Sequence, residues 1–244
     1  MAIPTVRGVS SAKAEGTTTV APGIPAGTVS GELMLACIAG ANAGAMSVSA
    51  QGGGAWALLT NGGIDTNAGA STANAAVFYD YYNGTQTAPT FNTPGNHGVA
   101  RIMTITGARS ADGATFAGEG EATDVTADAN MSTATNITTT DADCLIVGCF
   151  AAADDSPTFG ATFTNASLAS ITNQVTDTTT QGNDSSLSVV TGTKAVAGSC
   201  GTYTNTLTGT IGVAVKFVAI RPPAATTTSG IWTPNPSRLR LRTR

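Results

Sequence analysis

Apolar and polar residues alternate along several short stretches of this chain, with the two-residue period that is typical of β-strands. The alternation is clearest in GELMLACIA at 31–39 and in ADCLIVGCFA at 142–151. It returns in AAVFYDYY at 75–82, SLSVVTGTKA at 186–195, GVARIMTITGA at 98–108 and IGVAVKFVAI at 211–220. Turn sequences such as NGG, NG, PGN and GS lie between these stretches, which indicates short strands joined by tight connections.

The second half of the chain repeats the pattern of the first half at a constant offset of 112 residues. The repeat predicts two tandem copies of one β unit, at about 21–109 and 133–221. The matched pairs are Leu33/Leu145, Leu35/Val147, Cys37/Cys149, Ala39/Ala151, Trp56/Leu168, Leu59/Ile171, Val77/Val189, Phe91/Tyr203, Val99/Ile211, Met103/Val215 and Ile105/Phe217.

Alternating strands with one polar face predict antiparallel sheets that pack face to face. Each unit has too few strands and aromatic residues to enclose a core alone, so we expect both units to close one all-β, jelly-roll-like sandwich at 21–221. Two separate small domains are the alternative. An N-terminal arm at 1–20 and a linker with a C-terminal arm at 222–244 flank the sandwich, and both arms are expected to be disordered in free solution. The residues expected to face one another in the core are Leu33, Leu35, Cys37, Leu145, Val147 and Cys149.

The composition supports a β protein. Charged residues make up 11% of the chain, too few for the solvent-exposed faces of several helices, and aromatic residues make up 5%. The four cysteines, Cys37, Cys144, Cys149 and Cys200, form no CxxC pair, so a zinc site is not expected. The N-terminal sequence MAIPTVRGVSSAKAEG lacks the apolar core of a signal peptide, so we expect buried free thiols rather than disulfides.

The charge is unevenly placed along the chain, which carries a net charge of −4. Between Arg109 and Lys194 there is no Lys or Arg, and the interval holds eleven acidic residues, nine of them from Asp112 to Asp155. The C-terminal sequence RLRLRTR carries four arginines. The sequence therefore combines an acidic body with a basic C-terminal arm.

The C-terminal arm is the candidate attachment segment, and it follows the Pro/Thr/Ser-rich linker RPPAATTTSG. In an extended strand its arginines lie on one face, about 6.5–7 Å apart. The backbone could extend a partner's sheet while the guanidinium groups bind an acidic strip, either on another structural protein or in the Asp112–Asp155 region of a second copy. The acidic body and the lack of interleaved aromatics disfavour nucleic acid as the partner. The candidate partner-binding residues are Trp232, Arg238, Leu239, Arg240, Leu241, Arg242 and Arg244.

Candidate catalytic and metal-binding residues are few. The single histidine, His97, lies in the turn sequence TPGNHGVA without a nucleophile-elbow motif, so we interpret it as a surface turn residue. The acid pairs Asp141/Asp143 and Asp154/Asp155 could line a calcium site, but no EF-hand pattern is present and solvated loop acids are the favoured interpretation. The glycines of QGGGAW lack the context of a phosphate-binding loop, and no cofactor is expected.

An aromatic group could form a sugar-stacking platform. Alternation places Phe78 and Tyr82 on one strand face with Asp80, and Tyr79 and Tyr81 on the other face. Since one of these faces has to be core, we favour core packing over a sugar site. The aromatic residues concerned are Trp56, Phe78, Tyr79, Tyr81 and Tyr82.

The order of segments resembles β-sandwich proteins encoded in the structural gene clusters of tailed bacteriophages. The resemblance is carried by GELMLACIAGA, GAWALL, AVFYDYY, APTFN, VARIMTITGA, TTDADCLIVGCFAAA and VAVKFVAIRP, and it covers roughly residues 20–222. It implies a virion component of the head-decoration, fibre-base or tail-associated type, assembled in the host cytoplasm with other virion proteins and copies of itself. We therefore expect a non-enzymatic structural protein without nucleic-acid or membrane binding. A module that binds host-surface glycans is the alternative.

Overall fold

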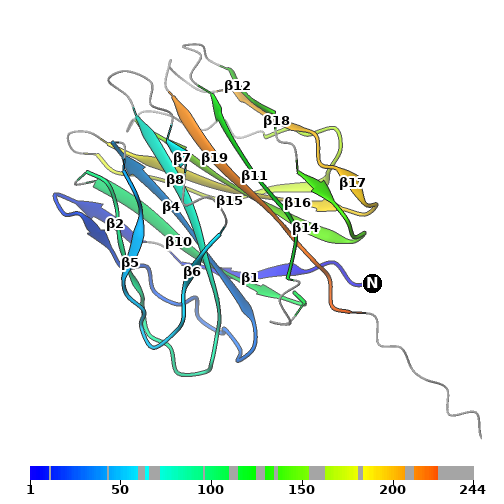
Figure 1. The fold of residues 1–244 in the computed structure, drawn as a ribbon, viewed down its shortest axis with the longest axis horizontal. Coiled ribbons are helices and arrows are strands. Elements are labelled where there is room, and N and C mark those ends of the chain that lie inside the picture. The colour runs from blue at the N-terminus through cyan, green and yellow to red at the C-terminus, as the bar shows by residue number, and fades with distance from the viewer. Residues whose placement is uncertain are drawn as a thin grey trace, which may run out of the picture.

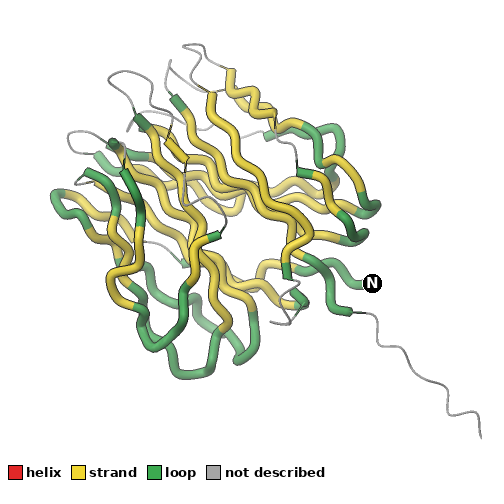
Figure 2. The backbone as a smooth tube through the Cα atoms, in the orientation of Figure 1, coloured by secondary structure: helices red, strands yellow, loops and turns green. Residues whose placement is uncertain are grey.

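The computed structural model describes residues 1–10, 12–42, 44–59, 64–65, 72–95, 97–109, 115–124, 130–134, 137–153, 163–180, 184–206 and 212–224. Throughout these segments the chain forms β-strands, turns and loops and contains no helix, which confirms the all-β prediction. Figure 2 shows the strands as two broad layers with loops at their ends. Every strand pair within the described residues is antiparallel.

Two large sheets form the centre of the molecule (Figure 1). The N-terminal sheet has the order β1 (Thr5–Val9), β10 (His97–Thr106), β4 (Leu33–Ala41), β8 (Ala73–Tyr81) and β6 (Ala57–Leu58), with β2 (Ala12–Glu15) on β10 and β7 (Ile64–Asp65) on β8. The C-terminal sheet has the order β11 (Phe116–Asp124), β19 (Val213–Ile220), β14 (Cys144–Ala152), β16 (Ser186–Lys194) and β15 (Ala169–Thr178).

The two large sheets pack face to face, with β4 against β14, β8 against β19 and β10 against β16. Their facing side chains form one hydrophobic cluster, which we call the central core. The alternation of β4 and β14 correctly predicts its members, because alternate residues of a strand share a face. All six residues that were expected there are buried in it: Leu33, Leu35, Cys37, Leu145, Val147 and Cys149.

Smaller sheets cover the outer faces of the large ones. The sheet of β3 (Thr19–Val20), β9 (Thr90–Asn92) and β5 (Ser47–Ala50) contributes to an outer core on the N-terminal sheet, with Phe91 among its buried residues. The pairs β12 (Asn130–Ala134) with β18 (Thr202–Thr206) and β13 (Thr138–Thr139) with β17 (Gly198–Ser199) belong to the second half, where Tyr203 is buried in an outer core on the C-terminal sheet. The premise that neither unit can enclose a core alone is therefore wrong, because each half has an outer core of its own beside the central core that the two sheets share.

The two halves share a strand order. In the N-terminal sheet Cys37 pairs with Val77, and in the C-terminal sheet Cys149 pairs with Val189, so this register keeps the offset of 112 residues. The shared order and register support the predicted duplication, which stays a prediction.

The offset of 112 residues fails at the last strand of each half. Leu33 pairs with Ile105 but Leu145 pairs with Ile220, which shifts the correspondence by three residues. The predicted pairs Met103/Val215 and Ile105/Phe217 are therefore wrong, since Val215 and Phe217 face an outer core. Ile211, the predicted equivalent of Val99, lies outside the described residues.

The N-terminal segment is not a free arm. β1 and β2 both pair with β10 and complete one edge of the N-terminal sheet, which corrects the prediction for residues 5–9 and 12–15. The C-terminal arm from residue 225 onward lies outside the described residues, and so do all seven candidate partner-binding residues.

Candidate attachment site

The two ends of the described chain come together at one loop. This loop precedes β14 and presents Asp141 and Asp143. Arg221, directly after β19, forms an ion pair with Asp141 (Nε to Oδ2, 2.7 Å), and the Met1 amino group forms one with Asp143 (2.8 Å). We call these four residues the terminal anchor. Figure 1 shows the N-terminus beside the end of β19.

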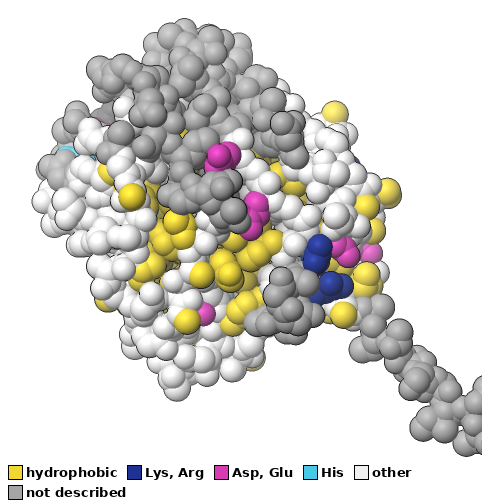
Figure 3. All heavy atoms as spheres, in the orientation of Figure 1, with side chains coloured by type: hydrophobic (Ala, Val, Ile, Leu, Met, Phe, Trp, Pro, Cys, Tyr) yellow, Lys and Arg dark blue, Asp and Glu magenta, His cyan; other side chains and the backbone are white. Residues whose placement is uncertain are grey.

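Backbone hydrogen bonds fix the same point of the chain. The Arg221 amide donates to the Thr115 carbonyl oxygen (2.9 Å), and the Arg221 carbonyl oxygen accepts from the Arg109 amide (3.1 Å). The Arg221 side chain also donates to Thr140 Oγ1 (3.0 Å), and Tyr81 Oη donates to the Arg109 carbonyl oxygen (3.3 Å). The chain therefore leaves the body from a rigid position between several strands. In Figure 3 basic and acidic side chains gather near the point where β19 ends.

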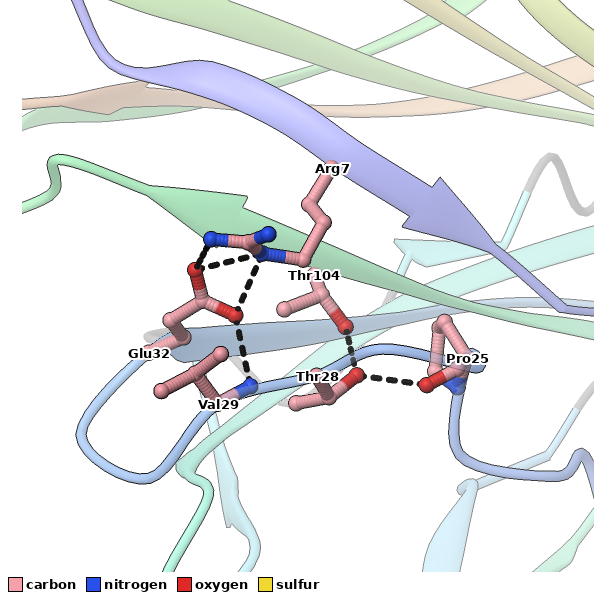
Figure 4. Close-up of polar contacts among 6 residues, drawn as sticks. All are labelled: Arg7, Pro25, Thr28, Val29, Glu32 and Thr104. Carbon is pink, nitrogen blue, oxygen red and sulfur yellow. Dashed lines mark hydrogen bonds and ion pairs between the residues drawn. The ribbon is translucent and has the colours of Figure 1, made fainter.

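The N-terminal strand is held in place by Arg7. Its guanidinium group binds both carboxylate oxygens of Glu32, with Nε at 2.7 and 2.9 Å, as Figure 4 shows. Glu32 also accepts from the Val29 amide (2.9 Å), and Thr28 bonds Thr104 on β10 (2.9 Å). The loop before β4 is thereby tied to β1 and β10. Burial opposes ionisation of Glu32, but the bonds from Val29 and Arg7 outweigh it, so the pKa of Glu32 lies below its ordinary value.

Replacing Glu32 by Gln should lower the free energy of unfolding at pH 7 by up to about 1 kcal/mol, because the pair with Arg7 is partly exposed. Because the pKa of Glu32 is lower in the folded state, its ionised carboxylate stabilises the fold fully at pH values above the unfolded-state pKa of about 4.3. This stabilisation is lost as the pH falls through the folded-state pKa. Urea unfolding of wild type and Glu32→Gln at pH 7 and pH 3 checks this. A stability difference that is the same at both pH values would contradict the role of the charge.

His97 was expected on the surface and is in fact buried. It is 5% exposed as the first residue of β10, two positions before the core residue Val99. Its Nδ1 makes no hydrogen bond within the described part of the chain. The interpretation of His97 as a surface turn residue is therefore wrong.

Two of the four acids that suggested a calcium site, Asp141 and Asp143, belong to the terminal anchor. Asp141 and Asp143 each face a positively charged group of the chain. Asp154 and Asp155 lie outside the described residues. In the segments that the structure describes, no group of three or more His, Cys, Asp or Glu residues could hold a metal ion.

The aromatic residues mostly fill cores. Trp56 and Phe78 are buried and pack against Phe91, with ring centroids 5.7 and 5.2 Å apart. Tyr79 packs edge-on against Phe116 at 5.0 Å and lies on the central-core side of β8, on the face opposite Phe78, and the alternation predicts this separation of the two rings. These contacts bear out core packing and remove two rings from the proposed sugar platform.

All four cysteines are buried free thiols, as predicted. Burial raises the pKa of Cys144 to about 11, and the nearby Asp141 adds to the shift. Burial also raises the pKa of Cys200. Both thiols are therefore protonated and unreactive at neutral pH.

Two cations, Arg101 and Lys216, lie at the central core, and no feature of the sequence pattern indicates this. Arg101 on β10 binds Asp177 on β15 and so bridges the two large sheets. Lys216 on β19 is 2% exposed and lies 3.0 Å from Glu121 on β11. Both cations interrupt apolar strands, and only the three-dimensional pairing identifies the acids that they contact.

Comparison with protein-family models, curated proteins and solved structures finds no match for this chain. Within the described segments there is no helix that is long and apolar enough to cross a membrane.

Proposed function

We propose that the protein is a non-enzymatic structural component on the exterior of a tailed-phage particle, attached through its C-terminal arm. The observation that carries the proposal is the terminal anchor. It fixes the start of the arm by an ion pair at Asp141 and by backbone bonds to Thr115 and Arg109. A force on the arm would pass directly into the two large sheets.

The sequence beyond the anchor suits attachment to a neighbour. Residues 222–230 reach at most about 30 Å when extended, which is enough to cross to an adjacent subunit. Arg238, Arg240, Arg242 and Arg244 then supply charge at alternate positions. Because the body is acidic, a second copy of this chain is a partner of complementary charge.

The edge strand β11 is the acceptor that we favour on a second copy. It ends the order of the C-terminal sheet, with β19 as its neighbour, and it carries Glu119 and Glu121 two positions apart. An arm that added to β11 would pair its backbone with the strand and bring its arginines beside these carboxylates, of which Glu121 already binds Lys216 of the same sheet. This arrangement makes the protein a homo-oligomer.

Deleting residues 231–244 should leave the body folded but prevent incorporation into particles. Fractionation of particles from the infected host that produces the chain would measure incorporation, and circular dichroism would verify the fold. Replacing the four arginines by Ser should weaken incorporation and make it less sensitive to salt, because less charge remains to be screened.

A matched variant with the four arginines replaced by Lys keeps the charge but cannot bind a carboxylate in the bidentate way that arginine does. Its incorporation into particles should therefore be intermediate between that of the wild type and that of the Ser variant. Sedimentation velocity of the purified chains tests self-association separately. If the truncated protein were incorporated normally, the attachment role of the arm would be wrong.

A glycan-binding module remains the second candidate, but no contact among the described residues favours it. Trp56 and Phe78 are in the outer core of the N-terminal sheet and are not available for stacking on a sugar. Binding of the purified protein to a glycan array would be the observation that restores it.

A further inference from the structure

Cys37 and Cys149 face each other at the centre of the molecule. They lie on β4 and β14, the strands that pack against each other where the two large sheets meet. Both thiols are fully buried in the central core. They also occupy equivalent positions of the two halves, since each pairs with the corresponding valine, Val77 or Val189.

The Cys149 side chain reaches the backbone of the opposite sheet beside Cys37. The Cys149 thiol donates to the carbonyl oxygen of Ile38, the residue after Cys37, and Sγ lies 4.0 Å from that oxygen and from the carbonyl oxygen of Ala76 on β8. A side chain of one large sheet therefore touches the backbone of the other.

Small residues allow this close approach. The central core contains Ala39 and Ala75 from one sheet and Ala151 and Ala214 from the other. Cα atoms of β4 and β14 come within 8 Å of each other, which is closer than the spacing of about 10 Å between typical packed sheets. A disulfide needs such an approach, because its Cα atoms are about 4.4–6.8 Å apart.

We propose that Cys37 and Cys149 are the site of a latent disulfide, which a small peroxide converts into a covalent link between the two large sheets. The N-terminal and C-terminal halves are otherwise held together by packing and by noncovalent contacts such as the Arg101–Asp177 and Met1–Asp143 ion pairs. The oxidised bond would join strands that lie 112 positions apart in the sequence.

The reaction balances with hydrogen peroxide as the oxidant. One thiolate attacks a peroxide oxygen, the O–O bond breaks, and the sulfur becomes a sulfenic acid while hydroxide takes up a proton to give water. The second thiol then attacks the sulfenic sulfur, the S–S bond forms, and the sulfenic oxygen leaves as a second water. Sulfur is oxidised by two electrons in total, and the peroxide is reduced by two.

The surroundings make this reaction slow at neutral pH. Hydrogen bonding from Cys149 and burial raise the pKa of Cys37 well above its ordinary value. Each cysteine has a cationic residue as its partner on the neighbouring strand, Arg101 for Cys37 and Lys216 for Cys149. Oxidation should therefore speed up as the pH is raised from 7 to 9.

The test uses the full chain with Cys144→Ala and Cys200→Ala, which leaves only the proposed pair. After treatment with hydrogen peroxide, unreacted thiols are alkylated in denaturant and the digest is analysed by mass spectrometry without reductant. We expect a peptide in which Cys37 is joined to Cys149. We also expect a rise in the thermal midpoint of roughly 5–15 °C, because the bond closes a loop of about 100 residues, and dithiothreitol should reverse the rise.

Two further variants complete the test. Cys37→Ala and Cys149→Ala, each in the wild-type background, should give no crosslink between the two strands and no gain in thermal midpoint after peroxide. Separate alkylation or overoxidation of Cys37 and Cys149 in the double variant would overturn the proposal. So would a wild-type protein in which peroxide joins only Cys144 and Cys200.

Discussion

Replacing Phe150 by Ala is expected to lower the free energy of unfolding by about 3–5 kcal/mol, the usual cost of removing a buried aromatic ring. Phe150 on β14 is fully buried. Its ring contacts three others in the outer core of the C-terminal sheet: Phe163 at 4.7 Å, Phe217 at 5.4 Å and Tyr203 at 5.8 Å between centroids. Truncation would leave a cavity that three rigid rings cannot close.

Urea unfolding followed by circular dichroism measures this effect. Val196→Ala is a suitable control, because Val196 is 72% exposed and its truncation should change the stability by less than about 0.5 kcal/mol. If Phe150→Ala cost no more than this control, the outer core would not be packed as described. Such a result would also remove the support for two enclosed cores in the two halves.

Asp80→Ala is expected to lower the free energy of unfolding by about 2–4 kcal/mol, because one buried carboxylate satisfies three donors, two of them from different loops. Asp80 Oδ2 accepts from the Ala55 amide (2.7 Å) and from Gln86 Nε2 (2.6 Å), and Oδ1 accepts from the Tyr81 amide (2.7 Å). Asp80 is 8% exposed, so water cannot readily replace it. A Cβ atom at Gly54 would collide with this network, which explains the glycine there.

Gln86→Ala is the matched comparison for Asp80. It removes one of the three donors and leaves the two backbone bonds of the carboxylate, so it should destabilise the protein less than Asp80→Ala does. Chemical unfolding of both variants under the same conditions gives the ranking. Equal or larger destabilisation by Gln86→Ala would show that Asp80 does not organise these loops.

Alternation predicted the strands and, in several of them, the faces. In β8 the sequence pattern separated Phe78 and Tyr82 from Tyr79 and Tyr81, and the structure places the two sets in different cores. The prediction was reliable here because the strand is polar at Asp80 and ends in half-buried residues, so its register can be recognised.

The last strand of each half shows where the pattern fails. All eight residues of β19 are buried, and both of its faces are apolar apart from Lys216. A strand that is covered on both sides carries no alternation to fix its register. A shift by three residues, an odd number, therefore exchanged the two faces without leaving any mark in the sequence pattern.

The candidate site could be predicted only in part. The arginines of the C-terminal arm stand out in the sequence by their spacing, but Arg221 does not, because a single arginine after a strand has no distinctive pattern. Its partner Asp141 lies 80 positions away. Arg7 and Glu32 also have no distinctive pattern in the sequence. Their ion pair helps to hold residues 5–9, which were predicted to be part of a disordered arm, as an edge strand of the N-terminal sheet. Such pairings depend on the tertiary fold.

The way β4 packs on β14 has a consequence for synthesis of the chain. The inner face of the N-terminal sheet is translated completely before β14 leaves the ribosome, so it stays uncovered until the second half has folded. During that time it can dock on the matching face of a neighbouring nascent chain, since the two inner faces are built alike. Rapid synthesis of the second half, or binding of a chaperone to the first half, would favour packing of the two sheets within one chain over pairing of two nascent chains.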